Sequence, residues 1–410
     1  MKCDLKNISS LGVSFVMLAS VTVPSLGMAF GAQSMAAGIV VVIMMSVFLS
    51  LSSYLRPIAI QNLVMVFFII NTLLLIVLLS GVQSFFTNNT FNDDRFVQTF
   101  SFLLLFIFGV FSWVLLSTKV TSCQADFSVK FVFYVLLLSG FVSLTGFSPF
   151  FSDARKPVLL FAEPSHFAVS IAPFLLYMAV TSQSRVKNVL LLLTIILALL
   201  QQSLTLLVSV LIVSVFSLRL HKLLFGFLIG AGFLVLGHES IDVDYYISRL
   251  NFTEDNDNLT ALVFMSGWER AYLNTIGSHG LGVGFQQLGF VGERGVMMEK
   301  LAVLGVGYLN LKDGGNVATK LISEFGIFAI MGLFVYLIYF VRFAKWLRGV
   351  SLQNIFAACP KKVFFVSCFV MYFIEFFLRG TGYFTSGGFL FLVSIIWLLV
   401  SKPNLNVVMR

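Results

Sequence analysis

Long apolar stretches separated by short polar connections recur along almost the whole chain. About 20 apolar residues cross the hydrocarbon core of a bilayer as a helix. A membrane-spanning barrel needs alternating apolar and polar positions, which these continuous apolar runs lack. The sequence therefore predicts an all-α polytopic integral membrane protein with about 12 transmembrane helices. The predicted spans lie near 11–30, 35–54, 62–81, 99–117, 130–148, 164–181, 188–201, 203–218, 222–237, 319–341, 363–378 and 386–401.

One connection is much longer than the others and divides the chain into three parts. We predict an N-terminal transmembrane bundle of about nine spans over 1–237, a large loop over 238–318, and a C-terminal bundle of about three spans over 319–410. A loop of this length without function is uncommon. Within it, SGWERAYLNTI at 266–276 predicts a short amphipathic helix, because Trp268, Tyr272 and Ile276 recur at helical spacing.

The number of spans depends on residues 188–218, which form either one long helix or two short ones broken at QQS, 201–203. Charge favours two. With two spans and a cytoplasmic N-terminus, 16 lysines and arginines fall on the cytoplasmic side, whereas the opposite short loops hold only Arg95, Arg155, Lys156 and Arg379. This bias is the one that the positive-inside rule predicts, and it places the long loop on the side away from the cytoplasm.

Composition agrees with a membrane protein and removes a nucleic-acid function. The 410 residues are 59% hydrophobic and 11% charged, whereas soluble domains carry about 25% charge. The net charge of +8 comes largely from positive residues beside the spans, which set orientation. The N-terminal segment is similar to a signal peptide, but further spans follow at once, which favours an uncleaved first span. Three cysteines (Cys3, Cys123 and Cys359) fall on the cytoplasmic side and Cys368 in a span, so no disulfide is expected.

The stretch AEPSHFA, 162–168, places ionisable residues at the start of a predicted span. Pro164 suits the first turn of a helix. Glu163 then lies at the outer interface, with His166 about one turn further along. An ordinary interfacial helix start would explain this pattern, but ionisable residues at such positions are also candidates for function.

The long loop supplies candidates for binding. GSHGLGVGFQQLGFVGERG, 277–295, has seven glycines in 19 residues, and glycine lets backbone approach a ligand closely; a flexible loop is the alternative. Arg249, Arg270 and Arg379 are candidates for phosphate binding, because guanidinium groups bind phosphate oxygens in pairs of hydrogen bonds. Solvated loop charge is the alternative for each of them.

Two ion pairs are predicted from helical spacing. Lys320 and Glu324 are four residues apart in KLISEFG, and Glu375 and Arg379 are four residues apart in MYFIEFFLRG. Residues at this spacing lie on the same face of a helix. No CxxC or Cys/His cluster indicates a metal site.

These stretches, in this order, resemble the O-antigen polymerase family of bacterial inner-membrane proteins. The residues that carry the resemblance are AEPSHFA at 162–168, QQSLT at 201–205, SRLNFTEDNDNLTALVFMSGWERA at 248–271, GLGVGFQQLG at 280–289, DGGNVATKLISEFGIF at 313–328 and LRGTGYFTSGGF at 378–389. The resemblance covers about 160–390; SGWERA departs from better-known relatives at Ser266, and the loop spacing varies.

The resemblance implies a fold similar to the lipid-phosphate-dependent membrane glycosyltransferases and a large periplasmic loop. It implies a metal-independent enzyme without a cofactor that joins oligosaccharide repeat units carried on undecaprenyl diphosphate at the periplasmic face. The lipid-linked oligosaccharide is then both donor and acceptor, and a chain-length regulator protein is a further candidate partner. Proposed roles are catalysis by Glu163 and His166, diphosphate binding by Arg249, Arg270 and Arg379, glycan or loop contacts by Trp268, Tyr272, Gly282, Gly284, Gln286 and Tyr383, and support by Lys320 and Glu324.

Two alternative functions stay open. An O-antigen ligase would use the same lipid donor but transfer the glycan to lipid A core. A flippase or other transporter of lipid-linked oligosaccharide would show charges buried in mid-span and related halves. The concentration of polar residues in one outer loop and its flanks argues against transport.

Overall fold

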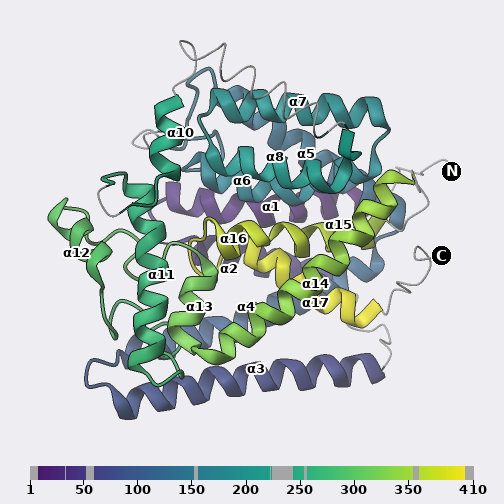
Figure 1. Ribbon diagram of the computed structural model, residues 1–410. Helices are drawn as coiled ribbons and strands as arrows, with labels where there is room; N and C mark the ends of the chain where they lie inside the picture. The colour runs from purple at the N-terminus through teal and green to yellow at the C-terminus, as the bar shows by residue number, and fades with distance from the viewer. Residues whose placement is uncertain are drawn as a thin grey trace.

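The chain folds into a bundle of α-helices with a smaller group of helices at one end (Figure 1). The computed structural model describes residues 8–32, 34–51, 60–151, 156–221, 223, 243–253, 256–353 and 360–401. Among these residues the regular secondary structure is helical, and two isolated β-bridges occur in loops. The prediction of an all-α protein is confirmed for this part of the chain.

The described residues of the first half of the chain supply eight helices to the bundle. They are α1 (Ile8–Ala29), α2 (Met35–Ser50), α3 (Ile60–Thr87), α4 (Asp93–Lys119), α5 (Ser122–Ser143), α6 (Pro164–Thr181), α7 (Ser184–Leu200) and α8 (Leu204–Ser217). Local capping explains several starts. Asn92 accepts a hydrogen bond from the backbone N–H of Arg95, and Thr121 and Gln124 form a reciprocal capping box, which satisfies N–H groups that a helix leaves free at its N-terminus.

The second half begins with the group at the end of the bundle and then returns to it. The end group contains α10 (Val243–Leu250), α11 (Leu259–Gly277), α12 (Val296–Val303) and α13 (Val317–Phe325). The bundle is completed by α14 (Ile327–Leu352), α15 (Pro360–Met371), α16 (Phe373–Phe377) and α17 (Ser386–Ser401). In Figure 1 the end group lies at the left and both chain termini lie at the right.

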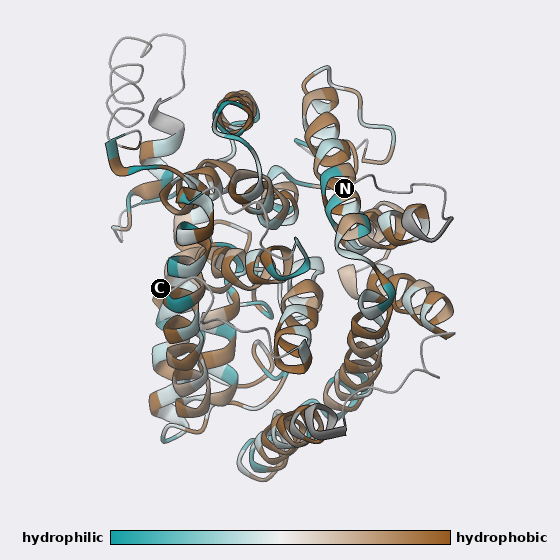
Figure 2. Cartoon of the chain, turned by 90° about the vertical axis from the view of Figure 1, so that its right-hand side faces the viewer, coloured by the Kyte–Doolittle hydropathy of each residue, from teal (hydrophilic) through white to brown (hydrophobic). Residues whose placement is uncertain are grey.

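Six of the described helices are long and apolar enough to cross a membrane: α1, α3, α4, α5, α6 and α14. Many large apolar side chains are exposed while others are buried, and hydrophobic positions occupy the helices throughout the bundle (Figure 2). In α3, only 11% of the most apolar window is buried inside the protein. Such an apolar outer surface would be unfavourable in water and suits lipid. The chain is therefore a helical membrane protein.

Helix α6 is the most enclosed of the candidate spans and lies near the centre of the bundle. It packs against α5, α8 and α15, and 78% of its most apolar window is buried. Pro164 occupies its first turn and Glu163 is its N-cap residue. The stretch AEPSHFA thus lies at one end of a central, largely buried helix.

The structure confirms two predictions about local structure. The segment 188–218 is broken into α7 and α8, which pack against each other, and Gln202 in the turn has a φ of 50°. The predicted helix over 266–276 is present as α11, although it begins seven residues earlier and is 19 residues long.

Two segments that were each predicted to form one continuous helix are divided into two helices, so these two predictions are wrong. Residues 319–341 were expected to form one span, but α13 ends at Phe325 and α14 starts at Ile327. Gly326 between them has a φ of 54°, and a Cβ there would lie 1.9 Å from the carbonyl oxygen of Gly280, so only glycine fits this turn. Residues 363–378 are likewise divided into α15 and α16 near Tyr372.

Other predictions fall partly outside the described residues. The predicted span 222–237 lies there, apart from Leu223. The expectation that no disulfide forms is wrong, since Cys123 is disulfide-bonded. The expectation considered only the redox compartment, and sequence does not show which cysteines are neighbours.

Candidate functional site

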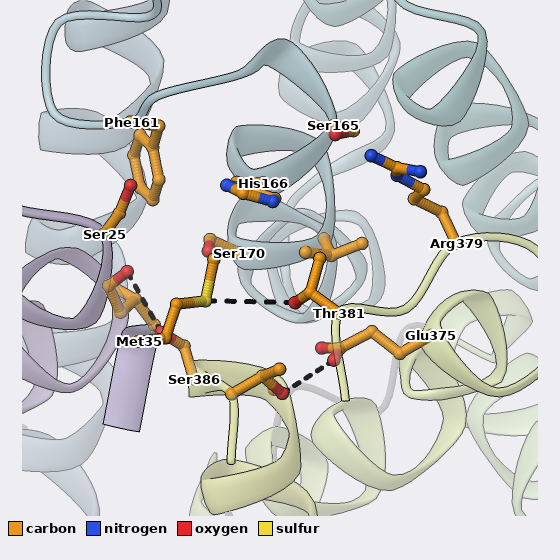
Figure 3. Close-up of a pocket in the computed structure, with 14 residues that line it drawn as sticks. Ser25, Met35, Phe161, Ser165, His166, Ser170, Glu375, Arg379, Thr381 and Ser386 are labelled. Atoms are coloured by element: carbon orange, nitrogen blue, oxygen red, sulfur yellow. Dashed lines mark hydrogen bonds between the residues drawn. The ribbon is translucent and has the colours of Figure 1, made fainter. Parts of the chain in front are cut away.

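A pocket opens where several helices of the bundle end (Figure 3). The empty space at this pocket is about 370 Å³ when the adjoining open solvent is counted with it. Its lining comes from the second half of α1, the start of α2, the first turns of α6 with Phe161 before them, α16, the segment that joins α16 to α17, and the start of α17. The lining residues are Val21, Ser25, Met35, Phe161, Ser165, His166, Val169, Ser170, Glu375, Arg379, Thr381, Thr385, Ser386 and Gly387.

Arg379 lies at the mouth of this pocket and is paired with Glu163. An Nη2 hydrogen of Arg379 is donated to Oε2 of Glu163 at 3.2 Å, and Ser165 donates its hydroxyl to the same carboxylate oxygen at 2.9 Å. Burial tends to raise the pKa of Glu163, but the charges of Arg379 and His166 and these two hydrogen bonds outweigh it and leave the pKa lowered. Glu163 does not line the pocket. Its carboxylate is therefore ionised and committed to Arg379.

His166 is more buried than Glu163, and it lines the pocket (Figure 3). The side chain is 7% exposed, and its Nδ1 has no hydrogen-bond partner within the described part of the chain. A buried polar nitrogen without a partner is unfavourable unless another group or water satisfies it. An imidazole presented in this way can donate a hydrogen bond to a bound molecule or accept one from it.

Glu375 is a pocket residue that the sequence interpretation assigned to a different partner. The predicted pair of Glu375 with Arg379 is wrong: α16 ends at Phe377, so Arg379 leaves the helix on which the two would share a face. The carboxylate instead accepts a hydrogen bond from the hydroxyl of Thr385 at 2.7 Å. It is 3% exposed and lines the pocket together with His166.

A second group of predicted residues surrounds Lys320 on α13. Its ammonium group lies 3.3 Å from Asp313 and 3.9 Å from Glu324, which confirms the predicted pair, and it donates to the carbonyl of Lys312 at 2.6 Å. Tyr383 donates its hydroxyl to Glu324 at 2.7 Å, and its ring lies 5.0 Å from the Lys320 ammonium. Burial raises the pKa of Glu324, against the effect of Lys320. Lys320 and Glu324 are thus the buried centre of an ionic network, and Asp313 at its edge is 43% exposed.

The glycine-rich segment contributes to this network through Gln286 and through its backbone. Gln286 accepts hydrogen bonds from Arg95 at 3.2 Å and from Lys320 at 3.4 Å. Gly282 and Gly284 have φ values of 83° and 95°, and their Cβ positions are blocked by Glu324 and Ser84 respectively. The glycines therefore let the segment pack closely against α13 and α3 rather than leave it as a flexible loop.

Arg270 is buried beside the same network. The guanidinium is 2% exposed, and its Nε and one Nη have no hydrogen-bond partner in the described residues. Burial lowers its pKa to about 10, although Glu324 acts in the opposite direction. Arg270 thus lies with Glu324, away from the pocket lining.

The remaining predicted residues are not brought into either group. Arg249 lies in the last turn of the short helix α10. Trp268 and Tyr272 lie on the outer face of α11, where they are 37% and 67% exposed. Neither the pocket lining nor the Lys320 network includes these three side chains.

The segment 378–385 connects the pocket to the ionic network. Arg379, Thr381 and Thr385 face the pocket, whereas Tyr383 bonds to Glu324. The backbone N–H of Gly380 also donates to the carbonyl of Gly315 at 3.2 Å. The position of Arg379 at the pocket mouth therefore depends on a segment that the ionic network anchors.

Comparison of the chain with protein-family models and with curated proteins finds no match.

Proposed function

We propose that the chain is an O-antigen polymerase, a membrane glycosyltransferase that joins oligosaccharide repeat units carried on undecaprenyl diphosphate. The growing chain leaves its own lipid diphosphate and is transferred to the terminal sugar of a fresh lipid-linked unit. In this proposal the protein works in the bacterial inner membrane with about twelve spans, and the loop and pocket face the periplasm. The family resemblance of the sequence is one support for it.

The observation that carries the proposal is the chemistry of the pocket at Arg379. A guanidinium, an imidazole and a buried carboxylate meet at the ends of apolar helices. A lipid diphosphate presents its phosphates at the membrane surface, and a preorganised guanidinium stabilises the charge that develops on such a leaving group. The neighbouring imidazole and carboxylate suit an acceptor hydroxyl, which must lose a proton.

The position of the pocket supports the proposed orientation. Its lining includes the second half of α1 and the starts of α2, α6 and α17, which the charge pattern of the sequence assigns to one side of the membrane, away from the cytoplasm. At the opposite helix ends, the ammonium of Lys187 donates to the carbonyl of Ser217 at 3.1 Å and that of Lys361 to the carbonyl of Ser117 at 2.9 Å. These lysines belong to the predicted cytoplasmic side.

The proposal assigns roles to the groups in and around the pocket. Arg379 binds the diphosphate, Glu163 holds Arg379 in place, and His166 hydrogen-bonds to the reacting groups. The ionic network of Lys320, Glu324 and Tyr383 positions the segment that carries Arg379. Exposed Trp268 and Tyr272 provide ring faces for sugars of the long glycan, outside the pocket.

Deletion of the gene in its host tests the proposed function. A polymerase mutant makes lipopolysaccharide with a single repeat unit on core and loses the ladder of longer chains on a gel. A ligase mutant loses O-antigen altogether and accumulates long polymer on the lipid carrier. An unchanged ladder would contradict both and favour the transporter alternative.

A further inference from the structure

Three ionisable side chains line the pocket, and only one of them is an acid: Glu375. Glu163, the acid that the sequence suggests, lies outside the lining and accepts hydrogen bonds from both Arg379 and Ser165. A carboxylate that is paired with a cation and half exposed is a weak proton acceptor. The acid with the better access to a molecule in the pocket is therefore Glu375.

The carboxylate of Glu375 is oriented from both sides. Oε2 accepts a hydrogen bond from Thr385, and the hydroxyl oxygen of Thr385 in turn accepts one from the backbone N–H of Gly388 at 2.9 Å. Oε1 lies against Gly387, where an added Cβ would be only 1.5 Å away. The carboxylate thus sits at the N-terminus of α17, where the helix dipole favours negative charge.

Glu375 also lies between the pocket and a second cavity. This second cavity, between α1, α6, α15 and α17, shares Val21, Val169, Ser170, Glu375 and Gly387 with the pocket. The rest of its lining is mainly apolar, and Glu375 is the only acidic or basic side chain among those residues. The carboxylate therefore forms the floor of the polar part of the site, with His166 and Arg379 above it.

We propose that Glu375 is the catalytic base of the glycosyl transfer, and that Glu163 serves only to position Arg379. This assignment rests on the proposed function. The Glu375 carboxylate takes the proton of the acceptor sugar hydroxyl while the hydroxyl oxygen bonds to the anomeric carbon of the growing chain. The bond from that carbon to the diphosphate oxygen breaks, and the diphosphate keeps the electron pair and remains on its lipid. The proton on Glu375 then passes to solvent.

The test is Glu375→Gln in the purified full-length protein, assayed with an undecaprenyl-diphosphate-linked repeat unit as substrate. General-base catalysis contributes about 10²- to 10⁴-fold, so we expect kcat to fall by that factor with KM nearly unchanged. Glu375→Asp should restore part of the rate. Glu299→Gln is the matched control, because Glu299 is exposed on α12 and should leave the rate unchanged.

Two glycine substitutions, one as test and one as control, examine the same assignment without changing Glu375 itself. Gly387→Ala must push the Glu375 carboxylate aside, whereas Gly332→Ala, also in a helix, meets no atom within 4 Å. We expect the first to lower kcat at least tenfold and the second to have no effect, with both proteins giving the same melting temperature within a few degrees.

The outcomes separate this inference from the proposed function. Full activity of Glu375→Gln would overturn the assignment while leaving a polymerase, and so would a loss seen only in His166→Gln, which would make the imidazole the base. A raised KM for Glu375→Gln at unchanged kcat would also overturn it, since that pattern indicates binding alone. Absence of polymer from the wild-type protein would contradict the proposed function itself.

Discussion

The pair of Glu163 and Arg379 offers the clearest separation of positioning from catalysis. The two side chains are 50% and 25% exposed, and their atoms are 3.2 Å apart. An exposed ion pair contributes about 0.2–1 kcal/mol. Glu163→Gln keeps an oxygen that can accept from Arg379, so we expect kcat/KM to fall by at most about fivefold, the equivalent of about 1 kcal/mol.

Replacement of the arginine should have a much larger effect. In the proposed reaction, Arg379→Ala would remove the charge assigned to the departing diphosphate, and loss of one such donor costs about 10²- to 10³-fold in rate. If Glu163 acts only through Arg379, the double variant should be no slower than Arg379→Ala alone. The two single variants and the double variant form a double-mutant cycle, and the non-additivity of their effects on the rate measures that dependence.

The assay is formation of lipid-linked polymer by the purified variants, with kcat and KM determined for each. Arg185→Ala is a suitable control, because Arg185 is exposed in the first turn of α7, outside the pocket lining. A positioning role for Glu163 is refuted if Glu163→Gln is as slow as Arg379→Ala and the two effects add, since Glu163 would then act on the substrate directly.

Three further predictions concern the network, the pH dependence and the glycine-rich segment. Lys320→Met leaves the fully buried Glu324 without its cation and should lower the free energy of unfolding by about 3–5 kcal/mol. Adding Glu324→Leu should largely restore the melting temperature, and an equal loss in the single and the double variant would argue against the network. The pKa of Glu163 is lowered from its ordinary value of 4.5. The ion pair with Arg379 therefore stabilises the folded protein fully above pH 4.5, and this contribution is lost as the pH falls through the lowered pKa. The stability difference between the wild type and Glu163→Gln should therefore narrow below about pH 4.5, and a difference that grows on acidification would reverse the sign of this argument. Gly282→Ala places a Cβ on a residue whose φ is 83°, within 2.5 Å of the Glu324 carbonyl group. Limited proteolysis should therefore cut the glycine-rich segment faster in this variant. Gly277→Ala, whose Cβ meets open space, should leave the rate of cutting unchanged.

The sequence predicts most helices well because their signals are local. The apolar runs correspond to observed helices, and the polar break at 201–203 corresponds to the turn between α7 and α8. The helical spacing of Trp268, Tyr272 and Ile276 corresponds to α11. The pair of Lys320 and Glu324 is predicted for the same reason, since both residues lie within α13. The helical membrane character of the chain follows from these signals alone.

The errors have a physical cause in tertiary contacts. Gly326 interrupts an apolar run because the carbonyl of Gly280, far away in sequence, occupies the space that a side chain would need. The early end of α16 removes Arg379 from the helix of Glu375 and brings it to Glu163 on another helix. Spacing alone does not reveal either partner, and for that reason the sequence interpretation assigned Glu375 to an ion pair instead of the pocket.

Reconstitution of the purified chain in a bilayer with a single defined substrate, an undecaprenyl-diphosphate-linked repeat unit, would test the proposed polymerase activity without other proteins present. We expect a ladder of lipid-linked oligomers, with one molecule of undecaprenyl diphosphate released for each bond formed and no ladder from Arg379→Ala. Substrate that stays at one repeat unit, in a preparation whose folding is verified by its melting temperature, would contradict the proposed activity.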